Sequence, residues 1–360
     1  YNTGIGREAL KLTTTGAHNT GIGRNALMSN TTANYNTAVG AASLDANTTG
    51  FGNTASGYAA LGANTSANYN AAFGAYASNA NTTGAANTAM GYGAMYYNTT
   101  SSYNTAYGNA ALQDNTTGTC NTSIGVQALA DNTTGCLNVA VGPQAGRLTT
   151  TGKNNVFVGP YAGCCNTTSN YSVAIGRMAM CGATGGLNTA VGNRALQAVT
   201  GLANVALGGA ALRDNTSGAC NTASGYKALA ANTSGHSNQA VGSHSLLANT
   251  TGNNNTGIGR SALQTNTTGI RNVATGNYAL YANTTGNYNT SSGYYNMMDN
   301  TTGAFNVSIG YRALENNTTA HCNTAIGGCA LYANTTGTGH VALGKNALRD
   351  NTTGACNSAL

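Results

Sequence analysis

The sequence predicts an all-β protein, a parallel β-solenoid (β-roll) of about 21 coils, and three observations support this prediction. A seventeen-residue pattern, N-T-A-(I/V)-G-x-x-A-L-x-x-N-T-T-G-x-x, recurs along the whole chain. Its fourth place is usually apolar and its fifth is glycine. Its N-T-T-G segment is rich in residues that form tight turns. Because a short fixed period across a chain is typical of solenoids, we expect residues 1–360 to form a single fibrous repeat array without a separate globular domain.

The repeat can be numbered from its first residue, which is usually Asn. Two copies, which begin at Ser172 and Asn188, are one residue short. The copies up to the second short one begin at Asn2, Asn19, Asn36, Asn53, Asn70, Asn87, Asn104, Asn121, Asn138, Asn155, Ser172 and Asn188. The next copies begin at Asn204 and Asn221, and the seventeen-residue spacing continues through Asn357.

Each copy is expected to contain two short strands. Positions 2 and 4, as in Val173 and Ile175, are often β-branched, which predicts a strand that directs both side chains inward and position 3 the other way. The Ala-Leu pair, as in Ala26-Leu27, predicts a second strand over positions 8 to 10 with Leu inward. Glycine at position 5 indicates a positive φ or a close backbone approach.

The composition excludes several other classes of protein. Seventeen residues are too few for a strand–helix–strand unit, and no heptad or 3.6-residue period is present. The net charge of +6 is spread thinly without a basic run, so we expect no nucleic-acid partner. No apolar run is long enough for a membrane span and no signal peptide is visible, so we expect no membrane insertion within this segment.

Two stretches resemble known families of surface fibres. The segment 172–180, S-V-A-I-G-R-M-A-M, resembles the head repeats of YadA-type trimeric autotransporter adhesins, and 154–163, N-N-V-F-V-G-P-Y-A-G, is similar to repeats of phage and bacterial surface fibres. The resemblance implies a left-handed parallel β-roll, three chains side by side, and an extracellular adhesin, fibre or viral appendage. It supplies no catalytic residues.

Position 12 usually opens an N-x-T/S sequon. In a secreted protein these asparagines would be candidate N-glycosylation sites along one edge of the fold. The alternative is that Asn and Thr are turn residues whose side chains stack in ladders. The candidates are Asn30, Asn47, Asn64, Asn81, Asn98, Asn115, Asn132, Asn166, Asn215, Asn232, Asn249, Asn266, Asn283, Asn300, Asn317, Asn334 and Asn351.

The threonines and tyrosines of the repeat allow more than one interpretation of what the surface binds. Thr-Thr pairs at positions 13 and 14, such as Thr250-Thr251, resemble the arrays of ice-binding solenoids, although turn chemistry explains them as well. Tyrosines at position 6, among them Tyr92 and Tyr226, could stack on sugars or make contacts between chains.

Nine cysteines are present, without a C-x-x-C pair or a Cys/His zinc spacing, so we expect no metal and no cofactor. Cys164 and Cys181 share position 10 of adjacent coils, which places them within disulfide range, and Cys120 with Cys136 is a second candidate pair. The cysteines at position 17 alternate with aromatic residues, so we expect them to be half-buried. They are Cys120, Cys220, Cys322 and Cys356.

These observations predict a non-enzymatic extracellular structural fibre or filament, which the resemblance assigns to a surface adhesin. The alternatives are a phage tail fibre, a glycan-coated filament and an ice-binding solenoid. The expected partners are further copies of the chain, as a homo-oligomer or polymer with a trimer implied by the resemblance, and glycans or a receptor on a host or cell surface. The chain runs from Tyr1 to Leu360 within the repeat pattern, so we expect it to be a segment of a longer protein at the cell surface or on a virion.

Overall fold

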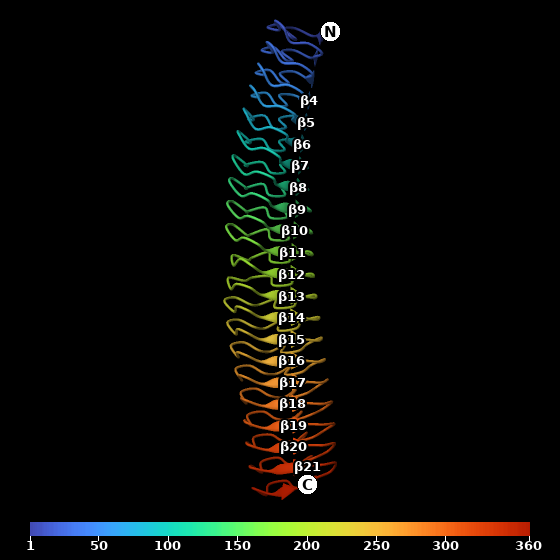
Figure 1. Ribbon diagram of the computed structural model, residues 1–360, viewed down its shortest axis with the longest axis vertical. Coiled ribbons are helices and arrows are strands. Elements are labelled where there is room, and N and C mark those ends of the chain that lie inside the picture. The colour runs from blue at the N-terminus through green and yellow to red at the C-terminus, as the bar shows by residue number, and fades with distance from the viewer. The chain divides into compact units, whose positions relative to one another are not determined.

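The computed structural model describes all 360 residues as an all-β solenoid of about 21 turns without helices, which confirms the predicted fold class. All strands are parallel and each spans two or three residues (Figure 1). The chain divides into two compact units, residues 1–184 and 185–360, and each unit is a stack of the same turn.

The strands fall at the same place in every turn. In the first unit they are β1 (Thr3–Ile5), β2 (Thr20–Ile22), β3 (Thr37–Val39), β4 (Thr54–Ser56), β5 (Ala71–Phe73), β6 (Thr88–Met90), β7 (Thr105–Tyr107), β8 (Thr122–Ile124), β9 (Val139–Val141), β10 (Val156–Val158) and β11 (Val173–Ile175). In the second unit they are β12 (Thr189–Val191), β13 (Val205–Leu207), β14 (Thr222–Ser224), β15 (Gln239–Val241), β16 (Thr256–Ile258), β17 (Val273–Thr275), β18 (Thr290–Ser292), β19 (Val307–Ile309), β20 (Thr324–Ile326), β21 (Val341–Leu343) and β22 (Ser358–Ala359).

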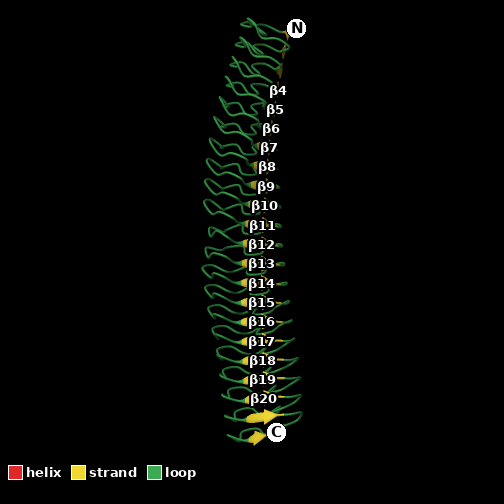
Figure 2. Cartoon of the chain, viewed as in Figure 1, coloured by secondary structure: helices red, strands yellow, loops and turns green.

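Within each unit, every strand pairs with its own copy in the next turn, so that equivalent residues stack. Thr20 lies beside Thr37 and Ile22 beside Val39, for example. The remainder of each turn is loop (Figure 2). This register explains why the sequence repeats, because each position of one turn lies beside the same position of the turns above and below it.

The predicted second strand at positions 8 to 10 is wrong. Positions 7 and 9 adopt positive φ in every turn, 61° at Asn25 and 52° at Leu27, and a strand needs negative φ. The segment is therefore a compact left-handed turn. Its leucine still points inward, as expected, since Leu27 is fully buried.

The strand also faces the opposite way from the prediction. Position 3 is buried, while positions 2 and 4 point outward: Ala38 is 0% exposed and Val39 is 39% exposed. The turn is so narrow that an alanine fills the space between the strand and the leucine-bearing loop. A β-branched residue therefore has room only on the outer side.

Phe157 is an exception that supports this explanation. It occupies position 3 of β10 and is fully buried. Its ring takes the space of two missing leucines, because position 9 is Gly146 in one turn and Gly163 in the next. A Cβ on either glycine would lie 2.6 Å or less from the ring. The interior volume of two turns is thus conserved by exchanging two leucines for one phenylalanine.

Two ladders of buried asparagines form the rest of the interior. At position 12 each carboxamide donates to the carboxamide one turn earlier: Asn64 Nδ2 lies 2.8 Å from Asn47 Oδ1, and Asn47 Nδ2 lies 3.1 Å from Asn30 Oδ1. The same Nδ2 also donates to the position-15 carbonyl of its own turn, as Asn47 does to Gly50. These bonds hold the N-T-T-G loop closed.

Position 1 supplies the second ladder. Asn36 Nδ2 donates to the Gly50 carbonyl at 2.8 Å, and Asn36 Oδ1 accepts the main-chain N–H of Asn53 at 2.9 Å. One carbonyl oxygen therefore joins both ladders in each turn. His340 stands in for Asn at this position, where its Nδ1 accepts the main-chain N–H of Asn357.

This arrangement determines where the candidate glycosylation asparagines lie in the fold. All the candidate asparagines have fully buried side chains except Asn351, which is half-buried. Their Nδ2 atoms point into the ladder, so a glycan cannot be attached there in the folded chain. The alternative interpretation, stacked turn residues, agrees with the structure.

Glycine at position 5 meets both conditions that the sequence indicated. Gly23 has φ of +134°, and a Cβ placed on it would lie 2.5 Å from the carbonyl oxygen of Gly40 in the next turn. Any side chain there would force the two turns apart.

The position-12 ladder is interrupted at Thr149. No carboxamide continues the ladder there, and the side-chain atoms Asn132 Oδ1, Thr149 Oγ1 and Asn166 Nδ2 are left without hydrogen-bond partners. Unpaired buried polar atoms destabilise a fold by about 1–3 kcal/mol each. We therefore regard the turns around Thr149 as the weakest part of the first unit.

The ladder predicts that replacing Asn249 lowers stability much more than replacing its neighbour Thr251. Replacing Asn249 by Ala removes a link that bonds to both Asn232 and Asn266, and should lower local stability by about 2 kcal/mol or more. Replacing the exposed Thr251 by Ala should change it by less than about 0.5 kcal/mol. Native-state hydrogen exchange of the adjoining turns measures both effects, and equal protection in the two variants would contradict the ladder's role.

Candidate functional site

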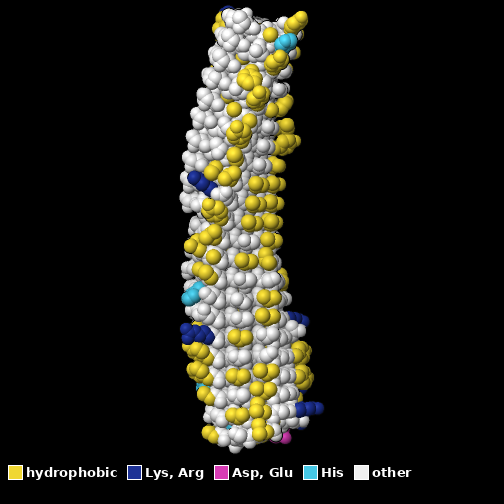
Figure 3. Space-filling view, in the orientation of Figure 1, with side chains coloured by type: hydrophobic (Ala, Val, Ile, Leu, Met, Phe, Trp, Pro, Cys, Tyr) yellow, Lys and Arg dark blue, Asp and Glu magenta, His cyan; other side chains and the backbone are white.

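The outer side of the β-strands is the largest regular surface of each unit. We call the side chains at positions 2 and 4 the strand face. Not one of them is charged along the entire sequence. Ile22, Ile124 and Ile258 at position 4 are 37%, 39% and 41% exposed, and the apolar side chains of this position form rows of hydrophobic atoms (Figure 3).

A row of aromatic side chains borders the strand face at position 17. Tyr35, Tyr69 and Tyr103 are each more than 60% exposed. Where two aromatics adjoin they stack, as Tyr288 and Phe305 do with ring centroids 4.9 Å apart and an interplanar angle of 5°. Such rings extend the exposed apolar surface.

The cysteines at this position are also exposed, not half-buried as expected from their exchange with aromatics. They are Cys120, Cys220, Cys322 and Cys356.

The charged residues lie elsewhere in the turn. Every Lys, Arg, Asp and Glu except Lys153 and Arg271 is found at positions 6, 7, 10 or 11, which we call the variable face. Burial, and then the nearby Asp131 carboxylate, raise the pKa of Asp114 above its usual value. Charged side chains are therefore confined almost entirely to the variable face, and the strand face has none.

The variable face contains two hollows. The larger, of about 510 Å³, lies in the first unit and is lined by Tyr76, Tyr92, Gly93, Tyr96, Tyr97, Asn109, Ala110, Gln113 and Gln127. The smaller, of about 270 Å³, lies in the second unit and is lined by Asn193, Arg194, Gly209, Ala210, Arg213, Tyr226 and Lys227. The sequence singled out Tyr92 and Tyr226 but not the hollows, which form because positions 6 and 7 are small in some turns and large in others.

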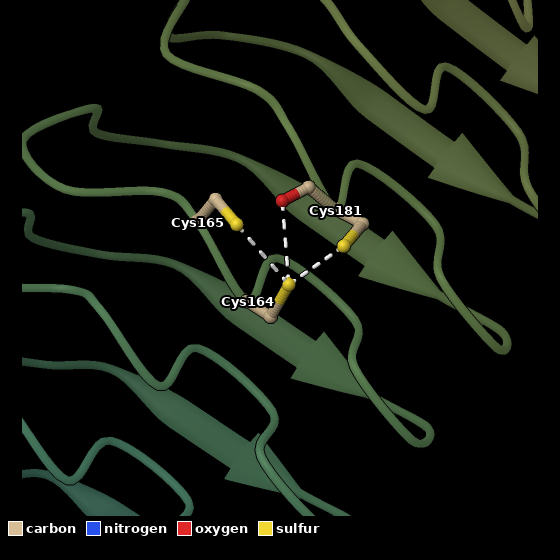
Figure 4. A group of neighbouring side chains, drawn as sticks. All are labelled: Cys164, Cys165 and Cys181. Atoms are coloured by element: carbon tan, nitrogen blue, oxygen red, sulfur yellow. Dashed lines mark hydrogen bonds between the residues drawn. The ribbon is translucent and has the colours of Figure 1, made fainter.

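The first unit also brings three thiols together on the variable face (Figure 4). Cys164 Sγ lies 2.6 Å from Cys181 Sγ and 3.4 Å from Cys165 Sγ, and all three sulfurs fall within 4.8 Å of one another. The candidate pair Cys164 and Cys181 is thus adjacent in the fold. Cys165 was missed by sequence reasoning, although its place next to Cys164 at position 11 was the available signal.

These thiols can support two kinds of chemistry. The hydrogen bond with Cys164 lowers the pKa of Cys181 to about 6, which favours the thiolate that reacts in disulfide formation. In the reduced state, three sulfurs so close together could instead hold a soft metal ion. The second candidate pair, Cys120 and Cys136, makes no sulfur–sulfur contact.

We predict that air oxidation of the full chain joins Cys164 to Cys181, because their sulfurs are already in contact. Alkylation followed by peptide mass mapping should find this pair cross-linked, and Cys165→Ser should leave the cross-link unchanged. Recovery of both cysteines as free thiols after oxidation would contradict the prediction.

Comparison with known proteins supplies no relative: no family model matches the chain, and no curated protein matches it. The structure has no helix of the length and apolar character that a membrane crossing requires. The strand face, the hollows and the thiols are the features of the chain that bear on its function.

Proposed function

We propose that this chain is a non-enzymatic structural fibre segment that associates side by side with further copies of itself through the strand face. The observation that carries the proposal is the uncharged, regularly spaced row at position 4, which consists mostly of outward apolar side chains and is interrupted by Ser56, Ser224, Thr275 and Ser292. Exposed apolar surface on this scale marks an interaction site. A flat solenoid side whose rows repeat at the spacing of strands matches best another copy with the same spacing.

The energetics favour association over many turns together. Burying one half-exposed aliphatic side chain contributes on the order of 1 kcal/mol. Eleven turns, the number of strands in the first unit, therefore contribute about 10 kcal/mol, against an association cost of roughly 4–15 kcal/mol. A few turns would not suffice, so length is part of the function.

The resemblance to adhesin head repeats supports a parallel trimer as the assembled form and an extracellular location, at a cell surface or on a virion. A surface adhesin and a phage tail fibre both remain within this proposal. Either would use the assembled strand faces as the stiff support and the variable face for recognition of a receptor or glycan.

Charge on the strand face should prevent association. We expect the full chain to sediment as an oligomer and the triple variant Ile258→Lys, Ile309→Lys, Ile326→Lys to sediment as a monomer at the same concentration. These side chains point outward, so the variant should retain the far-ultraviolet circular dichroism of the parent. Sedimentation velocity measures the change.

A matched control places the same three charges on the exposed position 14 of the same turns, as Thr268→Lys, Thr319→Lys and Thr336→Lys. The control should remain oligomeric. A parent chain that is monomeric at micromolar concentration, or a control that dissociates equally, would reject the proposal.

The strand face also favours a second candidate function, ice binding. Thr at position 2 and Ile or Val at position 4 form two parallel outward rows, as in Thr20 and Ile22. The Thr-Thr pairs of the turn are less suited, because Thr31 Oγ1 bonds to the Thr48 carbonyl in the next turn.

Ice binding by the strand face predicts thermal hysteresis by the parent chain that the strand-face lysine variant loses. No hysteresis in the parent at millimolar concentration would remove this candidate and leave the structural proposal untouched.

A further inference from the structure

The larger hollow on the variable face has the properties of a ligand site. Its volume of about 510 Å³ lies within the range of small-molecule pockets. Four tyrosines converge on it from two successive turns, and the sequence Y-G-A-M-Y-Y at 92–97 departs from the repeat at this point.

The tyrosine rings are held against one another. Tyr96 and Tyr97 meet edge to face with centroids 4.6 Å apart, and Tyr76 lies 5.9 Å from Tyr96 and 6.0 Å from Tyr92. Such contacts fix the ring orientations before a ligand arrives, which lowers the entropy cost of binding. Tyr92 and Tyr97 are nevertheless about half exposed, so their rings remain available.

The opposite wall of the hollow is made of carboxamides. The side chains of Asn109 and Gln113 make no hydrogen bond within the protein, and Gln127 makes one, which it accepts from Gln144. The hydroxyls of the exposed tyrosines Tyr92 and Tyr97 also lack protein partners. The hollow therefore offers both donors and acceptors that a polar ligand can use.

The lining contains no Lys, Arg, Asp, Glu or His. We propose that this hollow binds a sugar unit of a neutral oligosaccharide. Its aromatic rings would pack on the apolar C–H face of the sugar, and the carboxamides would exchange hydrogen bonds with the hydroxyl groups. An anionic ligand would meet no compensating positive charge here, and a cationic ligand no negative charge.

Small residues at position 7 create the recess. Gly93 and Ala110 occupy the place that Tyr76 and Gln127 fill in neighbouring turns. A Cβ on Gly93 would meet nothing within 4 Å, and its φ of +61° is the same left-handed conformation that non-glycine residues adopt at this position in other turns. A larger side chain here would fill the hollow without disturbing the turn.

The smaller hollow of the second unit provides an internal comparison. It has small residues at positions 6 and 7 of one turn, Gly209 and Ala210, but only one tyrosine, with Arg194, Arg213 and Lys227 around it. Its Tyr226 occupies the same repeat position as Tyr92 and is similarly exposed. The two hollows therefore separate the effect of the tyrosine cluster from that of an exposed ring.

The test is isothermal titration of the full chain with neutral hexasaccharides, namely cellohexaose, maltohexaose and mannohexaose. At least one should bind, and Tyr92→Ala and the filling variant Gly93→Gln should each weaken binding roughly tenfold or more. Tyr226→Ala should leave the affinity unchanged. The oligomeric state of each variant, followed by sedimentation, should equal that of the parent because the strand face is untouched.

Three results would overturn the inference: no neutral hexasaccharide binds, an oligogalacturonate or a proline-rich peptide binds more tightly through the same tyrosines, or Tyr226→Ala weakens binding as much as Tyr92→Ala. Full binding by a folded Gly93→Gln variant would do the same, since it would place the ligand outside the hollow. None of these results bears on self-association, which the lysine variants of the strand face test separately.

Discussion

The stacked carboxamides are the constraint on which the rest of the structure depends. A carboxamide is the smallest side chain that can both donate to and accept from its own copy one strand spacing away, so Asn can repeat indefinitely along a parallel stack. At positions 1 and 12 it also satisfies main-chain groups that a tight turn leaves unpaired, as Asn36 and Asn47 do at Gly50. The interior is therefore polar but almost fully hydrogen-bonded, and the unpaired side-chain atoms of Asn132 and Asn166 adjoin Thr149, one of the positions where the ladder lacks an asparagine.

A polar interior of fixed width determines where the apolar residues go. A small residue, usually alanine, fits inward from the strand and usually leucine from the left-handed loop, with Phe157 opposite two glycines as the compensated exception. The β-branched residues that favour strands must then point outward. The same packing that stabilises one turn thus leaves the chain with an exposed apolar row, and this row is the basis of the proposed assembly.

The sequence was sufficient for the period, the parallel register, the glycine at position 5 and the inward leucine, because each follows from a single residue type that recurs at one place. The sequence led to a wrong prediction where the usual preference of β-branched residues for a buried strand face was applied to an interior that has room only for small side chains. Apolar positions 2 and 4 were assigned to the core, yet position 4 ranges in size from Ser56 to Tyr107, which a close-packed core would not tolerate. Position 3, nearly always Ala, Ser or Gly, had the uniform volume of a core position. The hollows were beyond reach because they depend on the sizes of side chains seventeen residues apart and on which side of the turn a loop side chain leaves.

Hydrogen exchange of the asparagine side-chain amides, resolved by NMR, tests the central claim most directly. The account predicts two classes: strongly protected Nδ2 protons for the buried ladder asparagines such as Asn64 and Asn249, and rapid exchange for exposed asparagines such as Asn109 and Asn193. Uniformly rapid exchange at all of these side chains would contradict it, because it would mean that the asparagines face water and that the apolar residues at positions 2 and 4 form the core after all.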